Sequence, residues 1–102
     1  MPYEFEKQRR WVKRQVSSVS LLMLLSEECA ELTQAALKYI RACEIHPDNP
    51  TPVGPDAAWE SVWEESRDVL MILDALGLVT EDTSYNPKWQ RWAERLGYKE
   101  DK

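Results

Sequence analysis

The chain has 102 residues and a mass of 11.9 kDa, which predicts a single domain, residues 1–102, with room for a modest hydrophobic core. Hydrophobic residues make up 43% of the sequence and charged residues 30%, a balance typical of a globular protein and not of a disordered one. The net charge of −5 argues against a general nucleic-acid-binding protein, because affinity for phosphate backbones comes from clustered Lys and Arg.

The first half of the chain predicts two helices. Residues 3–15 mix charged and apolar side chains, which indicates a weakly amphipathic helix that mostly faces solvent. Serines at positions 17, 18 and 20 are candidate N-caps for a second helix that runs to about Ala42. This second segment has apolar residues at helical spacing and contains neither Gly nor Pro, so it is the strongest helical pattern in the sequence.

A proline-rich loop, His46–Pro55, is predicted next, because the segment is poor in backbone donors and rich in turn-forming residues. Asp56 is expected to cap a third helix, which ends at Gly77. A loop of this length between two long helices favours antiparallel packing. The two long helices are therefore expected to form the centre of the fold.

The C-terminal part predicts a fourth helix and no β-strand. Asn86–Pro87 provides a cap followed by proline at the first helical position, and the helix is expected to end at Gly97, followed by a short tail, residues 98–102. The fold class is therefore predicted as all-α, a four-helix bundle with two long antiparallel central helices, completed by oligomerisation. Three tryptophans are expected to close the bundle or a subunit interface: Trp11, Trp89 and Trp92.

Two pairs of acids lie on the two long helices. Glu28 and Glu31 are one helical turn apart, as are Glu65 and Asp68, so each pair can direct two carboxylates to one point. Like charges at this spacing repel, and these acids border the apolar stripe of each helix, where carboxylates are costly without a cation. A solvated helix face would explain either pair alone. The coincidence of two pairs favours a metal site.

The ligand types restrict the metal. The only histidine, His46, lies in the loop, which excludes a di-iron carboxylate bundle with its Glu-x-x-His motifs and also argues against a zinc enzyme. Oxygen ligands alone favour Mg²⁺ or Mn²⁺, and Mg²⁺ held by carboxylates usually works together with substrate phosphates.

Two segments carry a resemblance to a known family. Residues 27–32 (EECAEL) and 65–70 (ESRDVL) resemble the Glu-Glu-x-x-Glu and Glu-x-x-Asp signature of the all-α nucleoside triphosphate pyrophosphohydrolases. That superfamily contains MazG-like enzymes, dimeric dUTPases and phosphoribosyl-ATP pyrophosphatases. The resemblance covers residues 20–76. The segment between the two halves of the motif is longer than is usual for compact members, which affects the expected shape of the substrate pocket more than the metal site.

The resemblance implies a set of metal ligands and a reaction. Glu28, Glu31, Glu65 and Asp68 would coordinate Mg²⁺, with Mn²⁺ as a possible substitute, and a nucleoside triphosphate would be cleaved between its α and β phosphates to give a monophosphate and pyrophosphate. Glu27, beside these ligands, is the candidate for orienting or deprotonating the attacking water. We also expect a homodimer or homotetramer in which helices of different subunits build each pocket.

Substrate contacts are predicted at four residues outside the acid motifs. Lys38 follows Glu31 by two turns on the same face and suits a phosphate contact, although a solvated lysine would explain it equally well. Lys13 and Arg14 are weaker candidates for the phosphate tail. Trp59 is a candidate for stacking on the base, with core packing as the simpler interpretation.

The cysteines and the apolar segments bear on the compartment. Cys29 and Cys43 are too far apart on one helix to pair, so they are interpreted as small core residues in a reducing compartment. The longest apolar run, residues 16–25, is interrupted by serines and too short to span a bilayer. A cytoplasmic protein with no membrane partner is therefore expected. Two alternatives remain open: a non-enzymatic helical dimeric interaction module, and a phosphoribosyl-ATP pyrophosphatase.

Overall fold

The computed structural model describes residues 4–43, 48, 53–79 and 82–100, and every regular element in these ranges is a helix. The elements in chain order are α1 (Glu6–Gln15), α2 (Ser18–Ala42), α3 (Pro55–Ala75), the 3₁₀ turn η1 (Thr83–Tyr85) and α4 (Lys88–Arg95). The predicted all-α fold class is confirmed for these residues. In the same ranges, no helix combines the length and the apolar content that a membrane span requires.

The start of α2 follows its predicted cap. The Ser17 hydroxyl oxygen accepts a hydrogen bond from the backbone N–H of Ser20 at 3.1 Å, which satisfies one of the free donors of the first turn. The backbone of Ser17 is extended, so the chain turns between α1 and α2 at this residue. The helix then continues for 25 residues.

The start of α3 corrects the predicted loop boundary. Gly54 is the N-cap and Pro55 is the first helical residue, so the prediction of a loop through Pro55 with Asp56 as the cap is wrong at its C-terminal end. Proline suits the first helical position because its fixed φ matches the helix and its missing N–H has no partner there in any case. Asp56 lies in the first turn instead, where the helix dipole favours a carboxylate. Residues 46–47 and 49–52 of the predicted loop lie outside the described residues.

The ends of α3 and α4 follow their glycines. Gly77 has φ of 77°, and the backbone N–H of Leu78 donates to the carbonyl of Leu73 at 2.9 Å, which closes the last turn of α3. Gly97 has φ of 93° and ends α4 with the same type of bond. A left-handed residue is needed at both positions, and glycine adopts that conformation without a steric penalty. Both predicted helix ends are confirmed.

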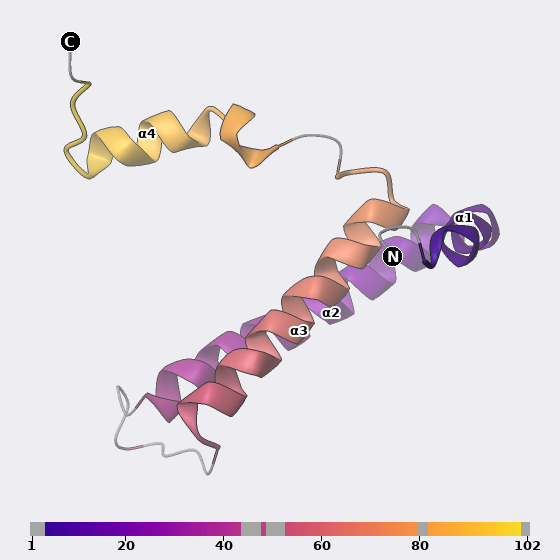
Figure 1. Cartoon of the computed structure of the whole chain (residues 1–102), viewed down its shortest axis with the longest axis horizontal. Coiled ribbons are helices and arrows are strands. Elements are labelled where there is room, and N and C mark those ends of the chain that lie inside the picture. The colour runs from indigo at the N-terminus through magenta and orange to yellow at the C-terminus, as the bar shows by residue number, and fades with distance from the viewer. Residues whose placement is uncertain (1–3, 44–47, 49–52, 80–81, 101–102) are drawn as a thin grey trace.

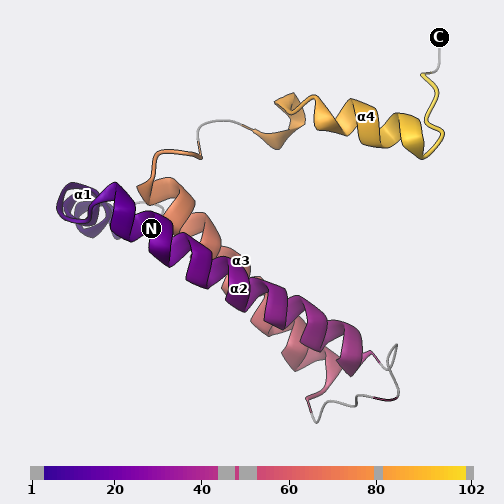
Figure 2. The ribbon, with the colours of Figure 1, turned by 180° about the vertical axis from the view of Figure 1, so that it is seen from behind.

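Helices α2 and α3 lie side by side and antiparallel along most of their length (Figures 1 and 2). Buried apolar residues form the seam between them: Leu21, Ala35, Ala42, Ala58 and Ile72. Three of these five are alanines, which bring the two backbones close together but bury little area. Among the described residues no large side chain is fully buried, so the core of this hairpin is thin.

Helix α1 crosses the end of the hairpin and is attached to α3 by one ion pair. The Arg9 guanidinium donates two hydrogen bonds to the Asp74 carboxylate, from Nε at 2.7 Å and from Nη2 at 2.9 Å. Both side chains are partly exposed. Of the predicted first helix, residue 3 lies outside the described ranges, and α1 begins at Glu6.

Helix α4 lies apart from the hairpin in both views (Figures 1 and 2). Its start is held locally, because the Trp89 indole Nε1–H donates to the carbonyl of Thr83 in η1, an element that the sequence did not predict. The radius of gyration is 18.0 Å, against about 13 Å for a compact chain of this length. The expected closing of a bundle by the tryptophans does not occur within the described part of one chain, where Trp11, Trp89 and Trp92 are all more than half exposed.

Both cysteines are free. Cys43 is half-buried, but Cys29 is exposed, so the interpretation of Cys29 as a core residue is wrong. It follows Glu28 on α2 and lies on a side of the helix that α3 does not cover.

Candidate metal centre

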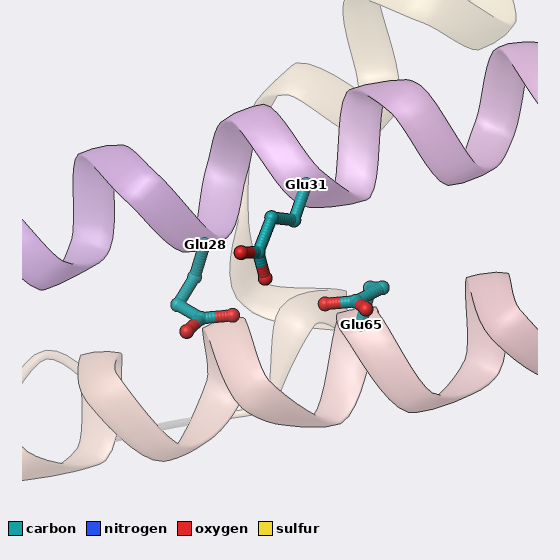
Figure 3. A group of neighbouring side chains, drawn as sticks. All are labelled: Glu28, Glu31 and Glu65. Carbon is teal, nitrogen blue, oxygen red and sulfur yellow. The ribbon is translucent and has the colours of Figure 1, made fainter.

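Three carboxylates meet between α2 and α3. Glu28 and Glu31 come from α2 and Glu65 comes from α3, and their side chains extend into the space between the two helices (Figure 3). One carboxylate oxygen of each lies within 4.8 Å of the others. We call these three residues the acid cluster.

The helix spacing explains why these acids meet. Glu28 lies seven residues from the buried Leu21 on one side and from the buried Ala35 on the other, and Glu65 lies seven residues from both Ala58 and Ile72. Residues at this spacing share the contact seam of paired helices. Two positions that would suit apolar side chains are therefore occupied by carboxylates.

Two oxygens of the acid cluster lack hydrogen-bond partners. Oε2 of Glu28 and Oε2 of Glu65 are both buried, and neither has a partner among the described residues. Buried polar atoms in native proteins nearly always have one, because an unpaired polar group loses its hydration without compensation. A cation between the helices would supply the missing interaction.

The electrostatics of the acid cluster are those of crowded acids. Burial raises the pKa of Glu28 above its ordinary value of 4.5, and the nearby charge of Glu31 raises it further. The pKa of Glu65 is raised by the same two causes in the same order. Both carboxyls therefore hold their protons more tightly than free carboxyls do, and a bound cation would reverse this effect.

Two predicted site residues lie outside the acid cluster. Asp68 is exposed on α3, one turn after Glu65, and it is not among the three converging carboxylates. Its charge nevertheless raises the pKa of both Glu28 and Glu65, so it lies within electrostatic reach of them. Glu27 is exposed on α2 and also lies outside the acid cluster.

A groove joins the acid cluster to two basic residues. It has a volume of about 380 Å³, and its lining includes Glu31 and Glu65 together with Lys38 and Arg41. Lys38 is thus placed beside the acids, as its spacing predicted. Arg41 was missed by the sequence reasoning, although it continues the same helix face one turn beyond Lys38.

No family model, curated protein or solved structure matches this chain in the comparisons made.

Trp59 lies at a different cavity. Its ring packs on Tyr39, with centroids 5.1 Å apart and planes at 60°, and the two line a cavity of about 480 Å³ with Pro55 and Asp56. Trp59 is 56% exposed, so it is not a core residue in this chain. It does not line the groove that holds Lys38.

The basic residues of α1 are not brought to the acid cluster. Lys13 lies near Asp74, where its charge helps to lower the pKa of that carboxyl, and Arg14 is exposed on α1. Neither lines the groove that contains Glu31 and Glu65.

Proposed function

We propose that this chain is a Mg²⁺-dependent nucleoside triphosphate pyrophosphohydrolase of the MazG-like, all-α type, which cleaves between the α and β phosphates and releases a monophosphate and pyrophosphate. The observation that carries the proposal is the convergence of Glu28, Glu31 and Glu65 from two helices, with two buried oxygens that have no partner among the described residues. The resemblance of residues 20–76 to the superfamily signature supports the choice of reaction.

The residues fit a hard divalent cation. Mg²⁺ takes six oxygen ligands at about 2.0–2.1 Å, so neighbouring ligand oxygens lie roughly 3 Å apart and opposite ones roughly 4 Å apart. The three oxygens within 4.8 Å need only small side-chain adjustments to reach that spacing. Asp68, whose charge reaches Glu28 and Glu65, would be the fourth ligand. Mn²⁺ accepts the same ligands, whereas the acid cluster offers none of the imidazole or thiolate ligands that zinc favours. When bound, Mg²⁺ neutralises the acids and polarises phosphoryl oxygens.

The groove supplies the phosphate contacts. Lys38 acts as a point charge, and the Arg41 guanidinium donates paired hydrogen bonds to phosphate oxygens. Because Glu31 and Glu65 line the same groove, the triphosphate lies with its phosphates between the acids and the bases. Lys38 thus keeps the role that the sequence predicts for it, and Arg41 replaces the weaker candidates Lys13 and Arg14.

The remaining roles concern water and the base. Glu27 accepts a proton from the water that attacks the phosphorus, since its carboxylate is exposed and adjacent to a ligand residue. Trp59 stacks on the base only if the substrate extends beyond the Lys38 groove to the Tyr39 cavity. The protein acts on cytoplasmic nucleotides as a homodimer or homotetramer, in which a second copy completes the thin core of the hairpin.

A second candidate is the non-enzymatic helical interaction module. The many large apolar side chains on the surface favour it, among them Leu22, Met23, Met71 and the four tryptophans on α3 and α4. Cation linkage separates the two functions, because a protein with a metal site gains stability as Mg²⁺ occupies it and a module without one does not.

The reaction is tested by measuring pyrophosphate release from a panel of ordinary and modified nucleoside triphosphates, with Mg²⁺, with Mn²⁺ and with a chelator. Phosphoribosyl-ATP belongs in the panel as the substrate of the other superfamily activity. We expect release from at least one triphosphate that depends on the divalent cation. Absence of release across the panel, together with a melting temperature that Mg²⁺ leaves unchanged, would contradict the proposal and favour the interaction module.

A further inference from the structure

Helix α4 has one side that is basic and apolar and that is free of its own hairpin. Its eight residues include three basic side chains and one acidic side chain. At helical spacing, Lys88, Arg91 and Arg95 lie beside Trp92, and these four residues line one surface cavity. The Trp89 and Trp92 rings stack with centroids 5.7 Å apart, and both are more than half exposed. A soluble helix with such a side is expected to have a partner.

The exposed side of α3 has the complementary composition. This helix contains six acidic residues and one basic residue. Trp63 and Leu70, seven residues apart, are 52% and 45% exposed, and Glu60 and Glu64 lie on the same side of the helix. The single basic residue, Arg67, is held over the Trp63 ring at 4.4 Å from its centroid.

The charges of the two surfaces match in sign and in spacing. Glu60 and Glu64 are four residues apart on α3, and Arg91 and Arg95 are four residues apart on α4, so each pair is separated by about 6 Å. Two ion pairs can therefore form at once when the helices lie together. In the described part of the chain, the ion pairs involve Arg9 and Arg10 only, so these four charges have no partner there.

We infer that α4 of one copy docks on the exposed side of α3 of a second copy, with Arg91 and Arg95 paired to Glu60 and Glu64 and with Trp92 packed near Trp63. Each chain carries both surfaces, so a two-fold dimer forms this contact twice. The contact also covers apolar side chains on these two surfaces that one chain leaves exposed, namely Trp63, Leu70 and Trp92. It specifies the surface used by the homodimer proposed above and does not depend on the metal site.

Charge reversal tests the pairing in the full-length protein. One variant carries Arg91→Glu and Arg95→Glu, a second carries Glu60→Lys and Glu64→Lys, and a third carries all four substitutions. The association state is measured by analytical ultracentrifugation, with circular dichroism to confirm the helical content. A matched control reverses two exposed charges on α1, Lys7→Glu and Arg14→Glu, which lie outside both surfaces.

We expect each double reversal to weaken the dimer at least about tenfold, because like charges would face each other across the contact. The four-substitution chain should dimerise again, and the α1 control should behave as the wild type. The dimer of the wild type should also weaken with rising salt. Restoration by the combined variant supports the pairing even where one double variant folds poorly.

Three results would overturn the inference. The first is a dimer that both double reversals leave intact, which would assign the subunit contact to another surface. The second is a wild-type monomer at all concentrations with α4 packed on its own hairpin. The third is a monomer whose α4 binds single-stranded nucleic acid in a manner abolished by Arg91→Glu and Arg95→Glu. A loss of the proposed enzymatic activity alone bears on the metal site and not on this contact.

Discussion

Two groups of charged side chains on the α2–α3 hairpin are built in opposite ways. Near the middle of the hairpin, Glu28, Glu31 and Glu65 place like charges together, and two of their oxygens are buried without partners in the described residues. At its end, Arg9 and Asp74 place opposite charges together with two hydrogen bonds at 2.7 and 2.9 Å. The pKa of Glu28 and of Glu65 is raised, whereas the pKa of Asp74 is lowered, mainly by its hydrogen bonds to Arg9.

The two arrangements of charge indicate different roles for the acid cluster and the Arg9–Asp74 pair. In the Arg9–Asp74 pair each charge meets its opposite, so this pair is favourable without any added ligand. Without a cation, the acid cluster is expected to lower the stability of the hairpin, because like charges and unpartnered buried oxygens lie together there. Such local conflicts are expected at functional sites. The acid cluster is therefore the site at which the proposed cation is expected, whereas the Arg9–Asp74 pair is expected to have a structural role only.

The largest expected effect is on turnover. Glu65→Gln should lower pyrophosphate release by at least about a hundredfold, because loss of a metal ligand removes several kcal/mol of transition-state stabilisation. Glu94→Gln is the matched control, since Glu94 is an exposed glutamate on α4 and is not among the converging carboxylates. Steady-state assays of the two variants check this, and similar activity in both would remove Glu65 from the site.

A smaller effect is expected from the bases of the groove. Lys38→Ala and Arg41→Ala should each raise KM for the triphosphate by roughly tenfold, because each removes one charge-assisted contact to phosphate. Neither should change the stabilisation by Mg²⁺, since neither contacts the acid cluster as a ligand. Lys13→Ala is the control and should leave KM unchanged. An effect of Lys13→Ala equal to that of Lys38→Ala would contradict the assignment of the phosphates to this groove.

The pH dependence of stability should differ between the acid cluster and the Arg9–Asp74 pair. Because the folded pKa of Glu28 and Glu65 lies above 4.5, the metal-free folded protein holds these protons more tightly than the unfolded chain does. Their contribution to the free energy of unfolding therefore falls as pH rises through and above 4.5. The contribution of Asp74 to the free energy of unfolding depends on pH in the opposite direction, because it is lost as pH falls through the lowered pKa of this carboxyl.

Thermal melts of the protein across this pH range, recorded in the presence of a chelator, check the sign of both contributions. Glu28→Gln should flatten the decline with rising pH and should raise the melting temperature of the metal-free protein near neutral pH, because it removes one like charge. With Mg²⁺ the order should reverse, since the cation binds the deprotonated carboxylates and protects only the wild type. A lower melting temperature for the metal-free variant than for the metal-free wild type would contradict the description of the acid cluster as repulsive.

The smallest expected effect is on the melting temperature when the Arg9–Asp74 ion pair is removed. Arg9→Ala should lower the melting temperature by only about a degree or two, because both partners are partly exposed and surface ion pairs contribute little. A double-mutant cycle with Asp74→Asn measures the coupling between the two residues. The change should be the same with and without Mg²⁺. A dependence on Mg²⁺ would mean that the α1 junction and the metal site are linked.

Local signals made most of the fold predictable from sequence. Ser17, Gly77 and Gly97 fix helix ends through bonds to residues within one or two turns, so their effect can be read from neighbouring positions. The pairing of Glu28 with Glu31 was predictable in the same way, because their spacing is set within one helix. The start of α3 was misplaced because Pro55 serves both as a loop residue and as a first helical residue.

Features that depend on contacts between helices were not predictable. Which acids of the two pairs meet depends on the register of α2 against α3, and that register brings Glu65 to the seam and leaves Asp68 exposed. The position of Trp59 on Tyr39, away from the Lys38 groove, depends on the same packing. The separation of α4 from the hairpin could not be read from its amphipathic pattern, because that pattern does not specify whether the partner surface lies on the same chain or on another.

The most direct test of the central claim is a titration of the metal-free protein with Mg²⁺ by isothermal calorimetry, at constant ionic strength, for the wild type, Glu65→Gln and the control Glu94→Gln. The account predicts saturable binding to the wild type and to Glu94→Gln, and none to Glu65→Gln. Equal binding to all three proteins, or no binding to the wild type, would contradict the assignment of a divalent cation to Glu28, Glu31 and Glu65.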